Sequence, residues 1–267
     1  MIDLGKKNVL GVLVDAVDYE SAIERIANAG IAGVPYGVTA LAVHGVMTGV
    51  GNRIQRYRIN ALDLVTPDGQ PVRWGLNLIH RAGLRDRVYG PTLMLGVCER
   101  ASREGLPVYF YGSTEDVLGR LVNNLKLKFP TLQIAGIESS KFSQISPREK
   151  EEIVRRIVSS GAKITFVGLG CPRQEVFVFE YRQSLNMPVV AVGAAFDYHA
   201  GVLEEPRQEI QRLGMQWAYR LAQNPRRLWK RYLLLNPIYL FLLTLQATRA
   251  WVPDTAGVPP TTDLRYG

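Results

Sequence analysis

The chain has 267 residues, of which 47% are hydrophobic and 21% charged; this ordinary globular composition suits one large α/β domain or two small ones. Two distant cysteines and three histidines argue against a disulfide framework or a structural zinc site and favour a reducing cytoplasm. The net charge of +8 is concentrated near the end, where seven basic and no acidic residues lie between Arg212 and Arg249. Interleaved with Leu, Trp and Tyr, this charge favours an anionic membrane surface over nucleic acid.

Apolar, strand-like runs alternate with helix-like runs over most of the chain. The first strand is expected at 8–14, in an N-terminal region that does not resemble a signal peptide. A helix beginning at Asp18 or Ser21 and ending at Gly30 follows. The run 36–50 is ambiguous between strand and helix. Further strands are expected at 61–65, 107–112, 132–137, 163–170 and 188–193, and further helices at 91–105, 114–130, 146–161 and 173–185. The alternation predicts an α/β, Rossmann-like fold with a mainly parallel sheet and helices on both faces.

Ligands of such sheets bind at the carboxyl ends of the strands, and four residues of interest follow predicted strands. Gly112 could present backbone N–H groups to a phosphate, or could only turn the chain. Gln174 and Glu175 open a helix, where they could contact a ligand or cap the helix. Asp197 could bind a ribose hydroxyl or cap the next turn. The glycines at 168–170 lack the lysine of a P-loop and the spacing of a dinucleotide fingerprint.

Asp68 is a lone carboxylate between a proline and a glycine, directly after the apolar run 61–65. Pro-Asp-Gly is a common turn sequence, so Asp68 could cap its own turn. The same position at a strand end would also let the carboxylate approach a substrate and accept a proton. The residue pattern leaves both interpretations open.

The C-terminal region carries two Asn-Pro pairs, 224–225 and 236–237, each of which offers an N-cap and a first-turn proline. They are expected to divide the region into short helices. After Pro225, three basic residues share one helix face beside three apolar ones, which predicts an amphipathic interfacial helix. The basic residues are Arg227, Lys230 and Arg231, and the apolar ones are Leu228, Tyr232 and Leu235.

The following segment, 232–248, is uncharged but interrupted by its Asn-Pro pair, which favours shallow membrane insertion over spanning. A buried helix or a homo-oligomer interface would be equally apolar. The Pro/Thr-rich residues 253–267 are expected to form a disordered tail. The predicted organisation is therefore a catalytic α/β domain (1–209), a basic and apolar helical appendage (210–252) and this tail.

Six motifs resemble, in order, the WecG/TagA/CpsF family of glycosyltransferases over residues 8 to 235. They are "DLVTPDG", "RDRVYG", "YFYGST", "GLGCPRQE", "VGAAFDYHAG" and "MQWAYRLAQNPRRLWKRY". The resemblance implies an inverting, metal-independent transfer of a hexose or an N-acetylhexosamine, such as N-acetylmannosamine, from a UDP-sugar. The implied acceptor is a polyprenyl-diphosphate-linked glycan at the cytoplasmic face of the membrane. The product serves cell-surface polysaccharide, exopolysaccharide or teichoic acid synthesis.

The resemblance also implies roles for individual residues. Asp68 is expected to remove the proton of the acceptor hydroxyl, and arginines are expected to stabilise the UDP leaving group in place of a metal. The appendage is expected to complete the active site when it binds lipid. The candidate substrate-binding residues are Thr39, His44, Arg87, Gly112, Gln174, Glu175, Asp197, Arg220, Arg227 and Arg231, and no metal or cofactor is expected.

Two positions depart from the family pattern. Ala42 stands where the family usually has an asparagine, and the nearby His44 could take the place of that side chain. Gln216 stands where the family generally has a glutamate. These departures leave a second hypothesis open, in which the protein is a catalytically weak, membrane-bound assembly partner of glycan enzymes. A nucleotide-dependent redox enzyme is disfavoured because no G-x-G-x-x-G opens a helix.

Overall fold

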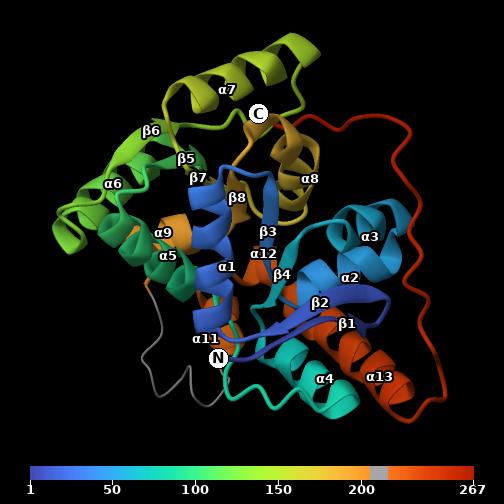
Figure 1. Cartoon of the computed structure of the whole chain (residues 1–267). Helices are drawn as coiled ribbons and strands as arrows, with labels where there is room; N and C mark the ends of the chain where they lie inside the picture. Colours follow the sequence, from blue (N-terminus) through green and yellow to red (C-terminus); the bar gives the residue numbers. More distant parts are fainter. Residues whose placement is uncertain (205–215) are drawn as a thin grey trace.

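A computed structural model describes residues 1–204 and 216–267, with all their side chains except those of Gln216, Arg227 and Arg231. Within these residues, six parallel strands form one sheet in the order β4-β3-β8-β7-β5-β6 (Figure 1). The strands are β3 (Tyr36–Leu41), β4 (Leu64–Pro67), β5 (Val108–Gly112), β6 (Ile134–Glu138), β7 (Ile164–Gly168) and β8 (Pro188–Ala191). This architecture confirms the predicted Rossmann-like α/β fold.

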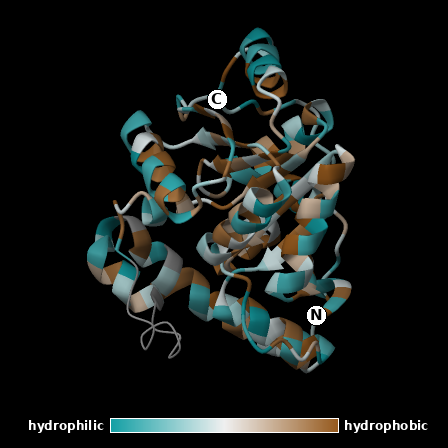
Figure 2. Ribbon diagram, turned by 60° about the vertical axis from the view of Figure 1, so that its left-hand side comes forward, coloured by the Kyte–Doolittle hydropathy of each residue, from teal (hydrophilic) through white to brown (hydrophobic). Residues whose placement is uncertain are grey.

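Helices bury apolar side chains against both faces of the sheet. One face is covered by α1 (Tyr19–Ala32), α5 (Gly90–Glu104), α6 (Glu115–Lys128) and α9 (Ala195–His199). The other face is covered by α2 (Val43–Gly51), α3 (Arg53–Asn60), α4 (Gln70–His80), α7 (Pro147–Ser159) and α8 (Arg173–Leu185). Hydrophobic residues accordingly gather along the interior strands, whereas the peripheral helices carry both classes of residue (Figure 2).

The prediction of a single first strand at 8–14 is wrong, because the chain reverses direction in the middle of this run. An antiparallel hairpin forms instead, from β1 (Asp3–Val9) and β2 (Val12–Val17). Leu10 and Gly11 connect the strands with φ of 57° and 88°, the left-handed backbone of a two-residue hairpin turn. The Asn8 side chain accepts a hydrogen bond from the Gly11 N–H at 2.7 Å.

The helix α1 begins as predicted and ends later than predicted. Asp18 is its N-cap, with Oδ1 2.9 Å from the Ser21 amide nitrogen. Gly30 lies inside the helix and not at its end. A Cβ there would lie 3.1 Å from Cγ1 of Ile164 on β7, so a glycine at this position lets α1 pack closely on the sheet. The helix stops at Gly33, whose φ of 63° suits a C-cap glycine.

Two further segments refine the sequence-based assignment. The ambiguous run 36–50 contains both elements, β3 and then α2. The strand expected at 61–65 is shifted to Leu64–Pro67, and α4, which the sequence analysis did not predict, follows it directly. This strand-to-helix turn carries Asp68.

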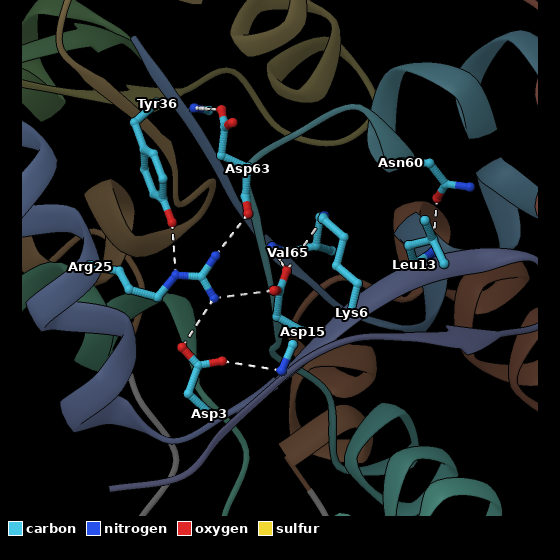
Figure 3. A network of polar contacts seen from close by, with 11 residues as sticks. Asp3, Lys6, Leu13, Asp15, Arg25, Tyr36, Asn60, Asp63 and Val65 are labelled. Carbon is cyan, nitrogen blue, oxygen red and sulfur yellow. Dashed lines mark hydrogen bonds and ion pairs between the residues drawn. The ribbon is translucent and has the colours of Figure 1, made fainter. Parts of the chain in front are cut away.

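A polar network attaches the β1–β2 hairpin to the outer edge of the sheet (Figure 3). Asp15 on β2 is almost fully buried, and its Oδ2 accepts the Val65 N–H of β4 at 2.8 Å. Lys6 Nζ lies 3.5 Å and Arg25 Nη1 3.2 Å from the same carboxylate. The hairpin therefore covers the edge strand and fixes the strand that ends at Asp68.

The C-terminal region is divided into short helices, as predicted, but only the first Asn-Pro pair interrupts the helical backbone. It contains α11 (Gln216–Gln223), α12 (Pro225–Trp229), the π-helical segment η1 (Lys230–Leu235) and α13 (Asn236–Ala247). Asn224, between α11 and α12, leaves the helical region with φ of −138° and ψ of 64°. The residues at the two later junctions keep right-handed helical φ and ψ angles, because a wider π turn before Pro237 relieves the clash that proline makes with the preceding turn. The domain boundary expected at 209–210 lies outside the described residues. None of the described helices is long and apolar enough to cross a membrane.

Residues 253–267 differ from the disordered tail that their composition suggested. They run past α3 and α8 and end near α7 (Figure 1). The Asn60 side chain donates to the Thr255 carbonyl at 3.0 Å, the Val258 N–H to the Arg53 carbonyl at 3.0 Å, and the Tyr181 hydroxyl to the Tyr266 carbonyl at 3.0 Å. The segment has no periodic pattern of its own, and its order comes from these contacts with the body.

Candidate active site

A cavity of about 420 Å³ lies at the carboxyl edge of the sheet, beside the ends of β3 and β4. Its volume falls within the range of small-molecule sites. Four of the candidate catalytic and substrate-binding residues named from the sequence line it together: His44, Asp68, Arg87 and Arg220. They come from α2, the turn after β4, the segment before α5, and α11, so the fold gathers them from positions as far apart as 44 and 220.

Asp68 is held at the strand end by its backbone and lies partly buried against the cavity. Its N–H donates to the Leu41 carbonyl at 3.2 Å, and its carboxylate accepts the Gly90 N–H. Burial raises the pKa of Asp68 to about 6, against the lowering effect of Arg87, Arg220 and that N–H. A carboxylate with this pKa is ionised at neutral pH and is a stronger base than an exposed aspartate.

The two described arginines of the cavity rest on aromatic rings. The guanidinium carbon of Arg87 lies 4.3 Å from the centre of the Tyr89 ring, and that of Arg220 lies 5.9 Å from the Tyr198 ring. Tyr89 and Tyr198 contact each other edge to face at 6.3 Å. The tyrosine pair thus supports two cations beside one carboxylate, an arrangement suited to a phosphorylated ligand.

Thr39, Gln174 and Glu175 form a separate, buried cluster. Oε1 of Glu175 accepts from the Thr39 hydroxyl and from Nε2 of Gln174, both at 3.0 Å. Burial raises the pKa of Glu175, which favours its protonated form. These residues join the start of α8 to β3 and are not among those that line the Asp68 cavity, so their predicted contact with substrate stays a prediction.

Gly112 and Asp197 lie at the same edge of the sheet, beyond the cavity. Gly112 has φ of 106°, and a Cβ there would lie 3.0 Å from the carbonyl carbon of Gly168. The chain leaves β5 toward β6 and β7 toward β8, so these two glycines mark the point where the strand order reverses, the usual ligand crevice of open α/β sheets. Asp197 is half-buried on α9.

Two of the predicted arginines cannot be placed in the site. The backbone of Arg227 belongs to α12 and that of Arg231 to η1, but both side chains lie outside the described part of the chain. Their contact with a ligand stays a prediction. Over residues 1–204 and 216–267, the structure contains no group of three or more His, Cys, Asp or Glu side chains that could hold a metal ion.

The sequence analysis missed the apolar wall of the cavity. Trp74, Leu233 and Leu240 line it, from α4, η1 and α13. A signal was present, because Trp74 and Leu78 are four residues apart, the spacing of one helix face. It could be interpreted only once a helix had been recognised after Asp68.

The fold and the cavity define a class of protein. It is a Rossmann-like α/β protein with a carboxylate of raised pKa, and with arginines that could bind phosphate, at the carboxyl edge of its sheet. Residues 7–252 match the model of the glycosyl transferase WecG/TagA/CpsF family. The chain belongs to this family, which confirms the resemblance inferred from its motifs. The matched region includes α11, α12, η1 and α13 and stops before the extended segment 253–267.

A curated relative from Bacillus spizizenii is 31% identical over 176 residues. It is named N-acetylglucosaminyldiphosphoundecaprenol N-acetyl-beta-D-mannosaminyltransferase. The alignment covers 66% of this chain and 66% of the relative, just under two thirds of each.

Proposed function

We propose that the protein is an inverting glycosyltransferase that moves a hexose or an N-acetylhexosamine from a UDP-sugar to a polyprenyl-diphosphate-linked acceptor. The observation that carries the proposal is Asp68, a carboxylate with a pKa of about 6 in a cavity that also contains Arg87 and Arg220. Membership of the family and the name of the Bacillus relative support it. N-acetylmannosamine is the first donor sugar to test, since that relative is named for it.

In the proposed reaction, Asp68 accepts the proton of an acceptor hydroxyl while the hydroxyl oxygen attacks the anomeric carbon. The bond from that carbon to the UDP phosphate oxygen breaks, and the electron pair leaves with UDP. Attack from the side opposite the leaving group inverts the anomeric centre and needs no covalent intermediate. Because Asp68 is already ionised at neutral pH, the proton has an acceptor at the moment the new bond forms.

The proposed role of the arginines is to stabilise the diphosphate as its charge develops. Arg87 and Arg220 lie beside Asp68 in the cavity, and Arg227 and Arg231 are proposed to add charge from the same C-terminal region. The crevice at Gly112, with Asp197, is the proposed place for the nucleoside of the donor. Thr39, Gln174 and Glu175 are proposed to fix the loops that contact the sugar.

The proposed location is the cytoplasmic membrane surface, with the protein bound peripherally. The C-terminal helices combine basic residues with exposed apolar ones, among them Trp229, Leu233 and Phe241, a combination typical of interfacial helices. Lipid binding is proposed to hold α11, and with it Arg220, over the donor diphosphate. Truncation after residue 209 should then abolish transfer to a lipid acceptor, and full activity of the truncated chain would refute this part of the proposal.

Ala42 supports the second candidate, a catalytically weak assembly partner. It lines the cavity at the position where the family usually has asparagine, and its Cα lies 3.6 Å from where a Cβ on Gly69 would stand. His44 lines the same cavity and is proposed to bind the sugar instead. An Ala42→Asn variant that became much more active than the wild type would favour the second candidate.

The direct test is transfer in vitro. The purified protein would be incubated with a panel of UDP-sugars and a GlcNAc-diphosphate-polyprenyl acceptor, with and without EDTA, and the products examined by mass spectrometry. The proposal predicts addition of one sugar, unaffected by EDTA. Absence of transfer from every donor, with membrane extract supplied as a source of acceptors, would overturn it.

A further inference from the structure

The extended segment 253–267 lies outside the region that the family model matches and runs across the molecule from the end of α13 to the neighbourhood of α7 (Figure 1). Its first part is fixed to the β1–β2 hairpin and to α3. Asn8 Nδ2 donates to the Pro253 carbonyl at 2.9 Å, and Arg56 Nη1 donates to the Asp254 carbonyl at 3.0 Å. Its last three residues, 265–267, are here named the clip.

The clip pairs with the loop 139–145, which connects β6 to α7. The Ile145 N–H donates to the carbonyl of the first clip residue at 3.0 Å, and the Gly267 N–H donates to the Ser143 carbonyl at 3.1 Å. Gly267 is buried. The path of this loop at the carboxyl edge of the sheet is therefore fixed by a segment from the other end of the chain.

Ser140 connects the clip to the crevice at Gly112. Its hydroxyl donates to the main-chain oxygen of Gly267 at 2.6 Å, and its N–H donates to the Ser113 carbonyl at 3.2 Å. Ser113 directly follows Gly112 and has φ of 62°, a left-handed backbone that a residue with a Cβ rarely adopts. Such a conformation persists only where surrounding contacts hold it, and the bond from Ser140 is one of these contacts.

The clip also contacts α8, whose first turn follows β7. The Tyr181 hydroxyl donates to the Tyr266 carbonyl at 3.0 Å. The guanidinium carbon of Arg173, the first residue of α8, lies 6.0 Å from the centre of the Tyr266 ring, within the range of a cation–π contact. The clip thus touches the chain where it leaves β6 and where it leaves β7.

The elements on both sides of the loop have hydrogen bonds that do not involve the clip. The strand β6 pairs with β5, and α7 begins with a capping box formed by Ser146 and Glu149. Loss of the clip contacts would therefore leave the sheet and α7 with their own bonds. What the clip determines is the path of the loop between them and the backbone that this loop supports.

We propose that the clip is a positioning element of the donor site, which holds the backbone around Gly112 in the shape that binds UDP. This role rests on the proposed function and deepens it, because it assigns the support of the nucleotide crevice to a segment outside the family match. Ser140 and Tyr266 act through other residues and are positioning residues. An ordered crevice loses less conformational entropy when its ligand binds. Loss of a clip contact should therefore weaken donor binding and leave the chemical step nearly unchanged.

The first test compares two serines with the same bonding pattern, Ser140 and Ser160. In each, the hydroxyl donates to a main-chain oxygen at 2.6 Å and accepts the N–H of the residue two positions later. Ser160 lies between α7 and β7, at the opposite edge of the sheet, and is the matched control.

Ser140→Ala should raise the KM for the UDP-sugar roughly two- to tenfold, the range expected for one hydrogen bond. Its kcat and its KM for the acceptor should stay close to those of the wild type. Ser160→Ala should change none of the three values. Ser140→Thr keeps a hydroxyl and should return the donor KM toward the wild-type value.

A second measurement does not depend on turnover. Calorimetric titration with UDP should show a Kd that rises by a similar factor in Ser140→Ala and in Tyr266→Ala. Tyr266→Phe keeps the ring beside Arg173 and should bind UDP as the wild type does. A CD spectrum and a thermal midpoint close to those of the wild type would show that each variant is folded.

An unchanged donor KM and an unchanged UDP Kd in Ser140→Ala would overturn the proposed role of the clip while leaving the transferase proposal intact. An equal rise of the donor and acceptor KM values would also contradict it, because that result would indicate a general loss of structure. So would a lower thermal midpoint without a change in UDP affinity. If the wild type neither binds UDP nor transfers a sugar, the proposed function fails, and the clip loses its ligand with it.

Discussion

Two carboxylates near strand β4 have contrasting surroundings. Asp15 contacts the middle of the strand, where it has Lys6, Arg25 and the Val65 N–H at contact distance and is 2% exposed (Figure 3). Asp68 follows the end of the strand, accepts the Gly90 N–H and borders a cavity. A carboxylate surrounded by donors stabilises a structure, whereas one beside open space can still take up a proton. This difference distinguishes the structural acid from the proposed catalytic one.

The largest effect is expected for Asp68→Asn. Loss of the proposed base should lower kcat by about 10²–10⁴-fold, measured as sugar transfer with saturating donor and acceptor. Stability should not fall. Burial raises the pKa of Asp68 above its unfolded value, so its contribution to stability is present at low pH and is lost as the pH rises through about 6. At pH 7.5 the neutral asparagine should keep or raise the thermal midpoint. A wild-type rate in this variant would remove Asp68 from catalysis.

The matched change at the other carboxylate should give the opposite outcome. Asp15→Ala leaves Lys6 and Arg25 without their buried partner, which should reduce the free energy of unfolding by about 3 kcal/mol in urea denaturation. The folded fraction should lose far less turnover than Asp68→Asn does. A stable Asp15→Ala protein with no turnover would contradict the division of roles.

A change at Arg220 should affect the site through charge. Arg220→Gln removes a cation that lowers the pKa of Asp68, so the acid limb of the kcat/KM profile should move to higher pH. Loss of a charged contact with the diphosphate should also reduce kcat/KM by roughly 10–100-fold. Arg220→Lys should keep the position of the acid limb. An unmoved limb in Arg220→Gln would place this arginine outside the electrostatic field of Asp68.

The smallest effect is expected at the junction of α4 and α13. Tyr239→Phe removes the hydrogen bond to the Pro71 carbonyl and should lower the free energy of unfolding by about 1 kcal/mol. Tyr57→Phe, at a more exposed tyrosine, is the control and should change it by less than about 0.5 kcal/mol. Equal effects in the two variants would mean that the Tyr239 bond does not hold the helices together.

Local patterns predicted the elements whose signals are contained in a few adjacent residues. The helix 173–185 has the predicted bounds, and the four apolar runs after residue 105 became the strands β5, β6, β7 and β8 of the sheet. The hairpin at Leu10 and Gly11 was missed because the apolar run continues through the turn. The order of residues 253–267 was missed because it depends on contacts with α3, α7 and α8.

The candidate site was predictable only in part. Asp68 and Arg220 were paired through the family resemblance, since no local rule connects residues so far apart in the chain. The apolar wall of Trp74, Leu233 and Leu240 depends on how α4 packs on α13 at Gly75, where a Cβ would lie 3.0 Å from Leu243 Cδ1. By itself this glycine indicates only weak helix propensity. Sequence patterns identify residues capable of chemistry, and the tertiary packing decides which of them meet.

The most direct test of the central claim is the pH dependence of kcat/KM, measured for the wild type and for the residual activity of Asp68→Asn. The account predicts an acid limb near pH 6 in the wild type and no such limb in the variant. The same limb in both proteins would show that another group titrates, and would contradict the assignment of Asp68 as the base.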